Sequence, residues 1–485
     1  MNKELRRVSI VVLLMFLSLF ASTTIIQVVS ADQLKADGRN ARTLYASYAT
    51  ERGPILVDGQ PIAVSQPADD EFKFLRVYPQ GELYAPVTGF LTLYQGSTGI
   101  ESAENEYLAG TSNDQFLEQI NSIITGQDPK GASVELTIDP VVQQAAWDAL
   151  EGYEGAVVAI RPKTGEILAM VSRPSYDPNI LSQHASGAVI EDAYNQLLQD
   201  PADPLINRAM NGDLDPPGST FKLVVAAAAL ESGQFTIDST FPNPARLTLP
   251  QTDFEISNAD LAPCGPGEQA SILTAIQLSC NIPMAELGQA LGYRPIFEQS
   301  ERFGFNQSVN VPMPSEPSTY PRVLDEPQTM LSAFGQSDVR ASPLQMAMVS
   351  AAIANDGVLM QPTLVESVVA SDLTPIESFQ ATEFGRPISA GTADALTRAM
   401  VASVDNGAAS NATIDGVEVA GKTGTAENGA DEPFTLWFTG FAPASDPEVV
   451  VAVVVQNGGG LGQEGTSSGI SAPIGRQVLE AVLSR

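Results

Sequence analysis

The chain has 485 residues, too many for one ordinary hydrophobic core, so two or more globular units are expected. Hydrophobic residues make up 44% of it and charged residues 17%, which excludes wholesale disorder. Acidic side chains outnumber basic ones by 57 to 25, a formal net charge of −32, and no Lys/Arg cluster could neutralise phosphates, so a nucleic-acid partner is excluded.

The scarcity of histidine and cysteine narrows the chemistry further. The only histidine is His184, and the only cysteines are Cys264 and Cys280. No Cys-x-x-Cys or His-x-x-x-His pair exists, so we expect no metal site and no cofactor. His184 lies in a small, polar stretch (182–186) with loop character, which is more typical of a solvated or hydrogen-bonded histidine than of the base of a Ser-His-Asp triad.

The N-terminus predicts a membrane anchor over residues 1–31. Lys3, Arg6 and Arg7 precede an uncharged stretch, 8–30, long enough to cross a hydrocarbon core of about 30 Å. The basic flank should stay in the cytoplasm, which places the rest of the chain on the extracytoplasmic face of a bacterial membrane. Val29-Ser30-Ala31 resembles a signal-peptide cleavage site, so removal is the alternative, but the stretch exceeds the usual apolar core of about 7 to 15 residues.

Residues 32–138 form a first extracytoplasmic unit. Short apolar runs alternate with turns, and helical periodicity is confined to about 113–124, so we expect a separate, strand-rich unit. Turn formers at 126–131 indicate a linker.

Residues 139–485 form the second unit, of α+β class. A strand is expected at 134–138, just before this unit begins. Within the unit, strands are expected at 156–160, 167–171, 436–441 and 449–455, and helices at 141–150 and about 473–483. The turn Lys163-Thr164-Gly165 joins the strands at 156–160 and 167–171 as a buried hairpin. Because strands mark both ends and helical patterns fill the middle, we expect an antiparallel sheet flanked by helices.

Ser219 is the candidate nucleophile. Pro216-Pro217-Gly218 can only form a loop, and the run 223–230 fits a helix buried on all sides. Ser219 therefore falls at or near the first helical turn, where free N–H groups and the dipole favour a developing anion. Lys222 is one turn on and could act as the base if its pKa is depressed. The alternative is a serine cap followed by an exposed lysine.

Two further motifs carry compatible chemistry. In Ser279-Cys280-Asn281 the hydroxyl could relay a proton and the amide could hold a substrate amide, with Pro283 opening a helix. In Lys422-Thr423-Gly424-Thr425 a strand edge offers a second lysine and two hydroxyls to a carboxylate, and its backbone could pair with a peptide. Either motif alone is weak evidence.

The three motifs together, Ser-x-x-Lys, Ser-x-Asn and Lys-Thr-Gly in this order, resemble the penicillin-binding proteins and serine β-lactamases. Upstream, 51–55, 76–79 and 99–104 are similar to the pedestal motifs of class B penicillin-binding proteins. That class has an anchor, a non-catalytic, dimerisation-like pedestal, here 32–138, and a transpeptidase domain, here 139–485. The first unit is too short for the glycosyltransferase module of class A. The short pedestal, the acidity and the 437–443 stretch most resemble the actinobacterial penicillin-binding protein A group.

The resemblance implies a peptidoglycan D,D-transpeptidase with the penicillin-binding transpeptidase/serine β-lactamase-like fold. Ser219 would attack the penultimate D-Ala carbonyl of a stem peptide, Lys222 would be the base, and Ser279 would protonate the leaving amine. The substrate would be held by Asn281, Lys422, Thr423, Gly424 and Thr425. β-Lactams would acylate Ser219. The implied partners are D-Ala-D-Ala stem peptides, the membrane, and division or elongation proteins including a glycosyltransferase, in wall synthesis during growth and division.

Three alternatives stay open. Cys264 and Cys280 could form a disulfide or remain two buried thiols. A β-lactamase or D,D-carboxypeptidase shares the motifs but passes the acyl group to water, although the anchor and pedestal argue against a secreted β-lactamase. A scaffold for division or elongation proteins, with catalysis secondary, is disfavoured by the intact motifs.

Overall fold

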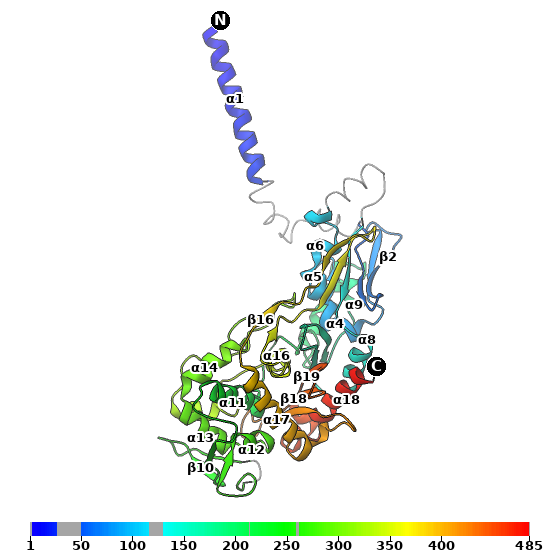
Figure 1. The fold of residues 1–485 in the computed structure, drawn as a ribbon. Helices are drawn as coiled ribbons and strands as arrows, with labels where there is room; N and C mark the ends of the chain where they lie inside the picture. The colour runs from blue at the N-terminus through cyan, green and yellow to red at the C-terminus, as the bar shows by residue number, and fades with distance from the viewer. Residues whose placement is uncertain (1, 27–49, 116–129, 213, 259–260, 485) are drawn as a thin grey trace.

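The computed structural model describes residues 2–26, 50–115, 130–212, 214–258 and 261–484 (Figure 1). The first element is the helix α1 (Asn2–Thr24), within which Arg6–Thr24 is long and apolar enough to cross a membrane. Its apolar side chains, from Val8 to Phe20, are exposed rather than packed in a core. The helix expected of an anchor is therefore present, whereas the candidate cleavage site at 29–31 lies outside the described residues.

The pedestal is more helical than the sequence predicts. Its strands are β1 (Ile55–Val57), β2 (Gln60–Pro67), β3 (Phe74–Val77), β4 (Leu91–Thr92), β5 (Gly96–Ser97) and β6 (Ser133–Leu136). Its helices are α4 (Gly81–Thr88), α5 (Gly99–Ala103), α6 (Asn105–Leu108) and the 3-10 turn η2 (Asn113–Gln115). These helices are short, and isolated turns of this length have no periodic apolar face that a sequence pattern could reveal. Of the helical pattern at 113–124, only η2 is described; the rest, with the 126–131 linker up to 129, lies outside the described residues.

The pedestal motifs converge on one buried carboxylate, Glu101. Arg52 Nε donates to Glu101 Oε2 and Arg76 Nε to Glu101 Oε1, both at 2.6 Å. Tyr78 Oη adds a hydrogen bond of 3.2 Å. Burial alone would raise the pKa of Glu101, but the charges of Arg76 and Arg52 outweigh it and hold the pKa below its usual range. Each of the three motifs in the sequence therefore supplies one part of a single ion cluster.

The pedestal sheet crosses the boundary expected at residue 138. Its strand order is β15-β14-β6-β1-β2-β3. Strands β14 (Val365–Val369) and β15 (Pro375–Ser378) come from far downstream, and β14 pairs antiparallel with β6. The hairpin β14–β15 thus extends a sheet whose other strands all precede residue 138 (Figure 1).

The larger unit is built on a five-stranded antiparallel sheet of order β17-β18-β19-β7-β8. The strands are β7 (Gly155–Ile160), β8 (Ile167–Arg173), β17 (Ala420–Ala426), β18 (Thr435–Ala442) and β19 (Val449–Val455). The expected hairpin at 156–171 and the strands at 436–441 and 449–455 are confirmed, whereas the strand expected at 134–138 forms as β6 in the pedestal sheet instead. The closing helix, α18 (Ser471–Leu483), is confirmed as well.

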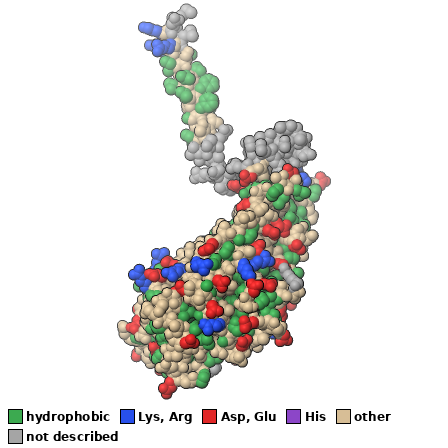
Figure 2. Space-filling model, viewed as in Figure 1, with side chains coloured by type: hydrophobic (Ala, Val, Ile, Leu, Met, Phe, Trp, Pro, Cys, Tyr) green, Lys and Arg blue, Asp and Glu red, His purple; other side chains and the backbone are tan. Residues whose placement is uncertain are grey.

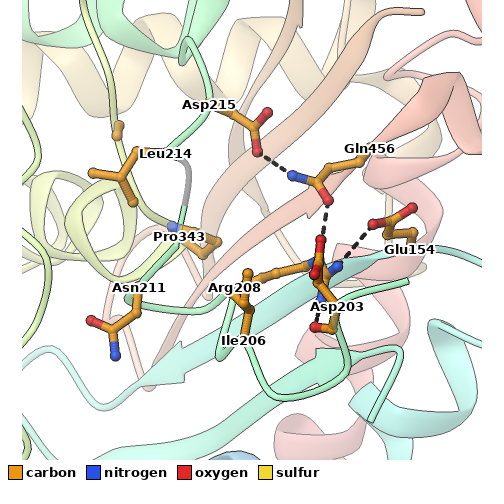
Figure 3. Close-up of a pocket in the computed structure, with 10 residues that line it drawn as sticks. Glu154, Asp203, Ile206, Arg208, Asn211, Leu214, Asp215, Pro343 and Gln456 are labelled. Atoms are coloured by element: carbon orange, nitrogen blue, oxygen red, sulfur yellow. Dashed lines mark hydrogen bonds and ion pairs between the residues drawn. The ribbon is translucent and has the colours of Figure 1, made fainter. Parts of the chain in front are cut away.

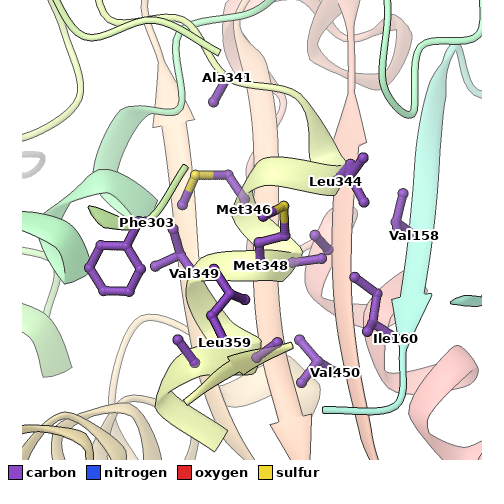
Figure 4. Close-up of a cluster of buried hydrophobic side chains, with 14 of the residues drawn as sticks. Val158, Ile160, Phe303, Ala341, Leu344, Met346, Met348, Val349, Leu359 and Val450 are labelled. Carbon is purple, nitrogen blue, oxygen red and sulfur yellow. The ribbon is translucent and has the colours of Figure 1, made fainter. Parts of the chain in front are cut away.

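Helices cover both faces of this sheet. On β19, Val450, Ala452 and Val454 join one apolar cluster, while the alternate valines join another. The first cluster contains α16 (Pro343–Ala354), which is buried on every side and packs Leu344 and Met348 toward β7 and β19 (Figure 4). The second contains α18 and α8 (Pro140–Ala149). A strand buried on both faces needs no polar alternation, which explains the unbroken valine run.

The middle of the chain is helix-rich, as expected. Its helices are α9 (Asn179–Ser182), α10 (Gly187–Gln199), η3 (Gly218–Phe221), α11 (Lys222–Glu231), α12 (Ile272–Gln277), α13 (Ile282–Leu291), α14 (Tyr293–Arg302), α15 (Glu326–Ser332) and α17 (Ala390–Asn406), followed by the 3-10 turns η4 (Ser410–Ala412), η5 (Asn457–Gly460) and η6 (Gly462–Glu464). Short two-stranded ribbons join them: β9 (Thr240–Pro242) with β12 (Gln269–Ser271), β10 (Arg246–Thr248) with β11 (Glu255–Ser257), and β13 (Leu359–Met360) with β16 (Glu383–Gly385). On the face shown in Figure 2, basic side chains are interspersed with acidic ones rather than gathered in a single patch.

Candidate active site

Ser219 lies in the 3-10 turn η3, directly before α11 begins at Lys222. Residues 222–229 of α11 are all buried, so the predicted all-apolar helix is present, and Ser219 falls in the turn that introduces it. Gly218 has φ +52, and a Cβ there would lie 2.7 Å from the carbonyl oxygen of Thr425. Only glycine allows this loop to approach β17 so closely. The loop and the strand are therefore in direct contact at the candidate nucleophile.

Lys222 is completely buried beneath this turn. Its Nζ donates to the carbonyl oxygen of Ser279 at 2.7 Å and to Oδ1 of Asn281 at 2.9 Å. Burial, with a contribution from the nearby charge of Lys422, lowers the pKa of Lys222 well below its usual range. Among the described residues Lys222 forms no ion pair with a carboxylate. No carboxylate among those residues therefore favours its protonated form.

The side chain of Lys422 extends from β17 to the turn that carries Ser279. It is also completely buried, and its Nζ donates to Oγ of Ser279 and to the carbonyl oxygen of Thr423, both at 2.8 Å. Burial lowers the pKa of Lys422 to about 7. Two lysines therefore contact one serine residue, the first at its backbone and the second at its hydroxyl.

The turn that carries Ser279 is constrained by its backbone conformation, by a disulfide and by the helix that follows it. Ser279 has φ +62, in the left-handed region that is costly for a residue with a side chain. Cys280 forms a disulfide with Cys264, so the disulfide alternative is the one that the structure contains. Asn281 directly precedes α13, which has Pro283 in its first turn, as the sequence predicts. These constraints fix the turn against both lysines.

Asn258 is a supporting residue that the sequence does not reveal. Its Oδ1 accepts the N–H groups of Asn281 at 2.9 Å and Ile282 at 3.1 Å. The Asn281 side chain in turn donates to the carbonyl oxygen of Ser257 at 3.0 Å. A single asparagine after a short strand has no local pattern that marks such a role, since its partners lie in another segment.

Strand β17 forms an edge of the sheet, since among the described residues it pairs only with β18. A Cβ on Gly424 would lie 2.8 Å from the carbonyl oxygen of Pro217, so this glycine lets the nucleophile loop lie against the strand. The Thr425 side chain is exposed, and its Oγ1 lies 2.7 Å from Oγ of Ser467. Thr423 Oγ1 donates to the carbonyl oxygen of Ala408 at 3.3 Å. The edge is thus available to an extended ligand beside Ser219.

Other chemistry-bearing residues lie elsewhere. Lys163 belongs to the turn between β7 and β8 and pairs with Asp446, as expected of a plain hairpin turn. Nδ1 of His184 lies 2.5 Å from Oδ2 of Asp70, in a loop of the pedestal, and its ring packs on Phe72. Within the described ranges no group of three His, Cys, Asp or Glu side chains could hold a metal ion.

Comparisons with known proteins match both units of the chain. The family model "Penicillin binding protein transpeptidase domain" matches residues 155–480, and "Penicillin binding protein A dimerisation domain" matches residues 52–134. The chain is 42% identical to the peptidoglycan D,D-transpeptidase PbpA of Mycolicibacterium smegmatis, over 100% of this chain and 99% of that one. It is 40% identical to PbpA of Mycobacterium tuberculosis over the same shares.

Solved structures give the same result. The ceftriaxone acyl-enzyme complex of penicillin-binding protein A from M. tuberculosis superposes with a TM-score of 0.87 at 40% identity, over 90% of this chain and 100% of that one. Its penicillin G acyl-enzyme complex superposes at 0.84 over the same shares. Fold, motif set and matches define a penicillin-binding transpeptidase. The chain belongs to the class B penicillin-binding proteins, the serine-type peptidoglycan D,D-transpeptidases.

Proposed function

We propose that the chain cross-links peptidoglycan stem peptides through an acyl-enzyme on Ser219. In the first half-reaction Ser219 Oγ attacks the carbonyl of the penultimate D-Ala, and the terminal D-Ala leaves as an amine. In the second, an amine of a neighbouring stem takes the acyl group. The observation that carries this proposal is the pair of buried lysines contacting the Ser279 turn beside Ser219.

Lys222 is the proposed base for acylation. Burial and the nearby charge of Lys422 lower the pKa of Lys222, which raises the fraction of neutral amine at a given pH, and a neutral amine is a competent base for a serine hydroxyl. A neutral amine has two N–H bonds, and two carbonyl oxygens, those of Ser279 and the Asn281 side chain, accept them. Its lone pair is then left to take the proton of Ser219.

Ser279 is the proposed proton donor to the leaving amine. Its hydroxyl accepts a hydrogen bond from Lys422 Nζ at 2.8 Å, which leaves its own O–H to donate toward the substrate. Lys422 with a pKa of about 7 can replenish that proton from its own ammonium group. Asn281, already oriented by Lys222, would hold the substrate amide with its remaining capacity.

The free edge of β17 is the proposed substrate platform. A stem peptide would add to the edge as an extra strand, and its terminal carboxylate would be bound by Lys422, Thr423 and Thr425, with Gly424 leaving space for the loop. The backbone N–H groups of Ser219 and of this strand would form the oxyanion hole. β-Lactams, which form acyl-enzymes in the M. tuberculosis relative, would acylate the same Ser219 hydroxyl.

The cellular setting is also a proposal. We infer a single-pass protein anchored by α1, with the pedestal (32–138) and the transpeptidase domain (139–485) on the extracytoplasmic face. The separate family-model matches at 52–134 and 155–480 support this division. Division or elongation proteins, among them a glycosyltransferase that supplies nascent strands, are the expected partners in growth and division.

Covalent labelling tests the central claim. Full-length protein in detergent is incubated with a fluorescent penicillin, denatured and resolved by electrophoresis, beside a Ser219→Ala variant and a control, Ser468→Ala, at a half-buried serine outside the three motifs. We expect label on the wild type and the control and none on Ser219→Ala. Transpeptidation itself is measured as cross-linked product from lipid-linked stem peptides. Equal labelling of Ser219→Ala would refute the assignment, and rapid release of hydrolysed penicillin would favour a hydrolase.

A further inference from the structure

A small polar cavity lies beside the residues that immediately precede the Ser219 loop in the sequence (Figure 3). Its volume is about 110 Å³, and its polar lining includes Glu154, Asp203, Arg208, Asp215 and Gln456. Asp215 stands four positions before Ser219 in the chain. The cavity is therefore next to the site although none of its residues belongs to the three motifs.

The Asp215 side chain ties the loop to the sheet at two points. Oδ1 accepts from Thr435 Oγ1 at 3.1 Å, and Oδ2 accepts from Gln456 Nε2 at 2.9 Å. Thr435 is the first residue of β18, and Gln456 follows the last residue of β19. Because Thr435 pairs with Ala426 of β17, Asp215 is attached at the end of the sheet where β17 approaches the nucleophile loop.

The partner of Asp215 is itself held in one orientation. Gln456 Oε1 accepts from Arg208 Nε at 3.1 Å, so the amide must present its NH2 group to Asp215. Arg208 Nη2 donates to Glu154 Oε1 at 2.9 Å. Figure 3 shows the resulting chain of interactions from Glu154 through Arg208 and Gln456 to Asp215.

The link from Asp215 to Ser219 is short and stiff. Pro216 and Pro217 fix two φ angles between them, and Trp437 Nε1 donates to the carbonyl oxygen of Pro216 at 2.8 Å. Gly218 N–H donates to the carbonyl oxygen of Gly335 at 3.1 Å. A shift at Asp215 would therefore pass to Ser219 rather than be absorbed by a flexible segment.

We propose that Asp215 is a positioning residue for acylation: its carboxylate fastens the nucleophile loop to the ends of β18 and β19 and so sets Ser219 against β17. Asp215 touches no reacting atom. It acts through hydrogen-bond geometry, and the proposal rests on the acylation of Ser219 proposed above.

The test compares Asp215→Ala with Asp215→Asn in full-length protein in detergent. Asparagine can still accept from Gln456 and donate to Thr435, whereas alanine can do neither. Stopped-flow measurement with a fluorescent penicillin separates non-covalent affinity from the acylation rate. A misplacement of about 1 Å can cost about 100-fold in rate. We expect Asp215→Ala to slow acylation by about 10- to 100-fold with affinity nearly unchanged, and Asp215→Asn to lose less than about tenfold.

Asp203→Asn is the matched control, because it removes a carboxylate from the same cavity at a side chain outside the chain of interactions from Glu154 to Asp215. It should acylate at the wild-type rate. Thr435→Val removes one of the two tethers and should give an intermediate loss, which keeps the test usable if Asp215→Ala does not fold. Wild-type rates in Asp215→Ala, an equal loss in Asp203→Asn, or an Asp215→Asn variant as slow as Asp215→Ala would each overturn the proposal. An unlabelled wild type would instead overturn the proposed function.

Discussion

The ion cluster around Glu101 allows a quantitative prediction for the pedestal. Replacing Glu101 by Gln removes the anion shared by Arg52 and Arg76 while keeping the side-chain shape. Arg52 is 5% exposed, Arg76 2% and Glu101 0%, so neither cation can turn to water. Breaking a buried ion pair by removing one partner costs about 3 to 5 kcal/mol. The remaining amide still accepts one hydrogen bond, so we expect the low end, about 3 kcal/mol, a large part of a domain stability of about 5 to 15 kcal/mol.

Amide hydrogen exchange measures this effect locally. A loss of about 3 kcal/mol should speed exchange of peptides from β1 to β3 by about 100-fold, since about 1.4 kcal/mol corresponds to a factor of ten. Peptides from β18 and β19 report on the same molecules and should change much less. Glu298→Gln makes the same substitution in the exposed, solvent-screened pair Arg294–Glu298 and should leave exchange in β1 to β3 nearly unchanged. A change below tenfold in β1 to β3, or one equal to that of Glu298→Gln, would refute the reasoning.

The other predictions concern pH and the support of the site. Because Arg76 and Arg52 hold the pKa of Glu101 below its usual range, the ionised Glu101 stabilises the pedestal fully above the pKa that it has in the unfolded chain. This stabilisation is lost as the pH falls through the lower pKa of the folded state. Amide exchange of pedestal peptides, measured at a series of acidic pH values, should show the loss in the wild type and not in Glu101→Gln. Because burial and Lys422 lower the pKa of Lys222, acylation should rise with pH as Lys222 loses its proton and should level off well below the free-lysine pKa of about 10.4; a rate that still climbs tenfold per unit at pH 9 would contradict a shifted base. Burial lowers the pKa of Lys422 to about 7, so non-covalent affinity for the penicillin carboxylate should weaken above that pH, and a flat affinity from pH 6 to 9 would argue against its role. Asn258→Ala leaves two N–H groups unpaired, at about 1 to 3 kcal/mol each, and should lower Tm and slow acylation, whereas Asn306→Ala, an asparagine outside the Ser279 support, should leave acylation unchanged.

Most residues of the candidate site could be predicted because they lie in short motifs whose residue types indicate their chemistry. Ser219 and Lys222 share one local turn, and the apolar run after them could only be a buried helix. The strands at 449–455 and 156–160 were clear because β-branched and small apolar residues fill them without interruption. The motif residues of three distant segments are then brought together by one sheet and the helices beside it.

The supporting contacts were not predictable for a physical reason. Asn258 and Asp215 act through partners far away in sequence, and a lone polar residue in a loop carries no periodicity. The pedestal helices were missed because they are only one or two turns long. The residues of the Glu101 cluster differ, because they lie within the three pedestal motifs that the sequence reveals. The sequence does not show, however, that these motifs meet at a single carboxylate.

The hairpin β14–β15 makes the two units mechanically dependent. A fragment beginning at residue 139 would lack β6, so β14 would expose a row of unpaired backbone groups. Such an unpaired edge can pair with another chain and cause aggregation. A fragment ending at residue 138 would lose β14 from its own sheet in the same way. Tension or torque arriving at the pedestal would also pass along these backbone hydrogen bonds into the catalytic half. Neither half is therefore expected to behave as an independent module when the chain is cut at the sequence boundary.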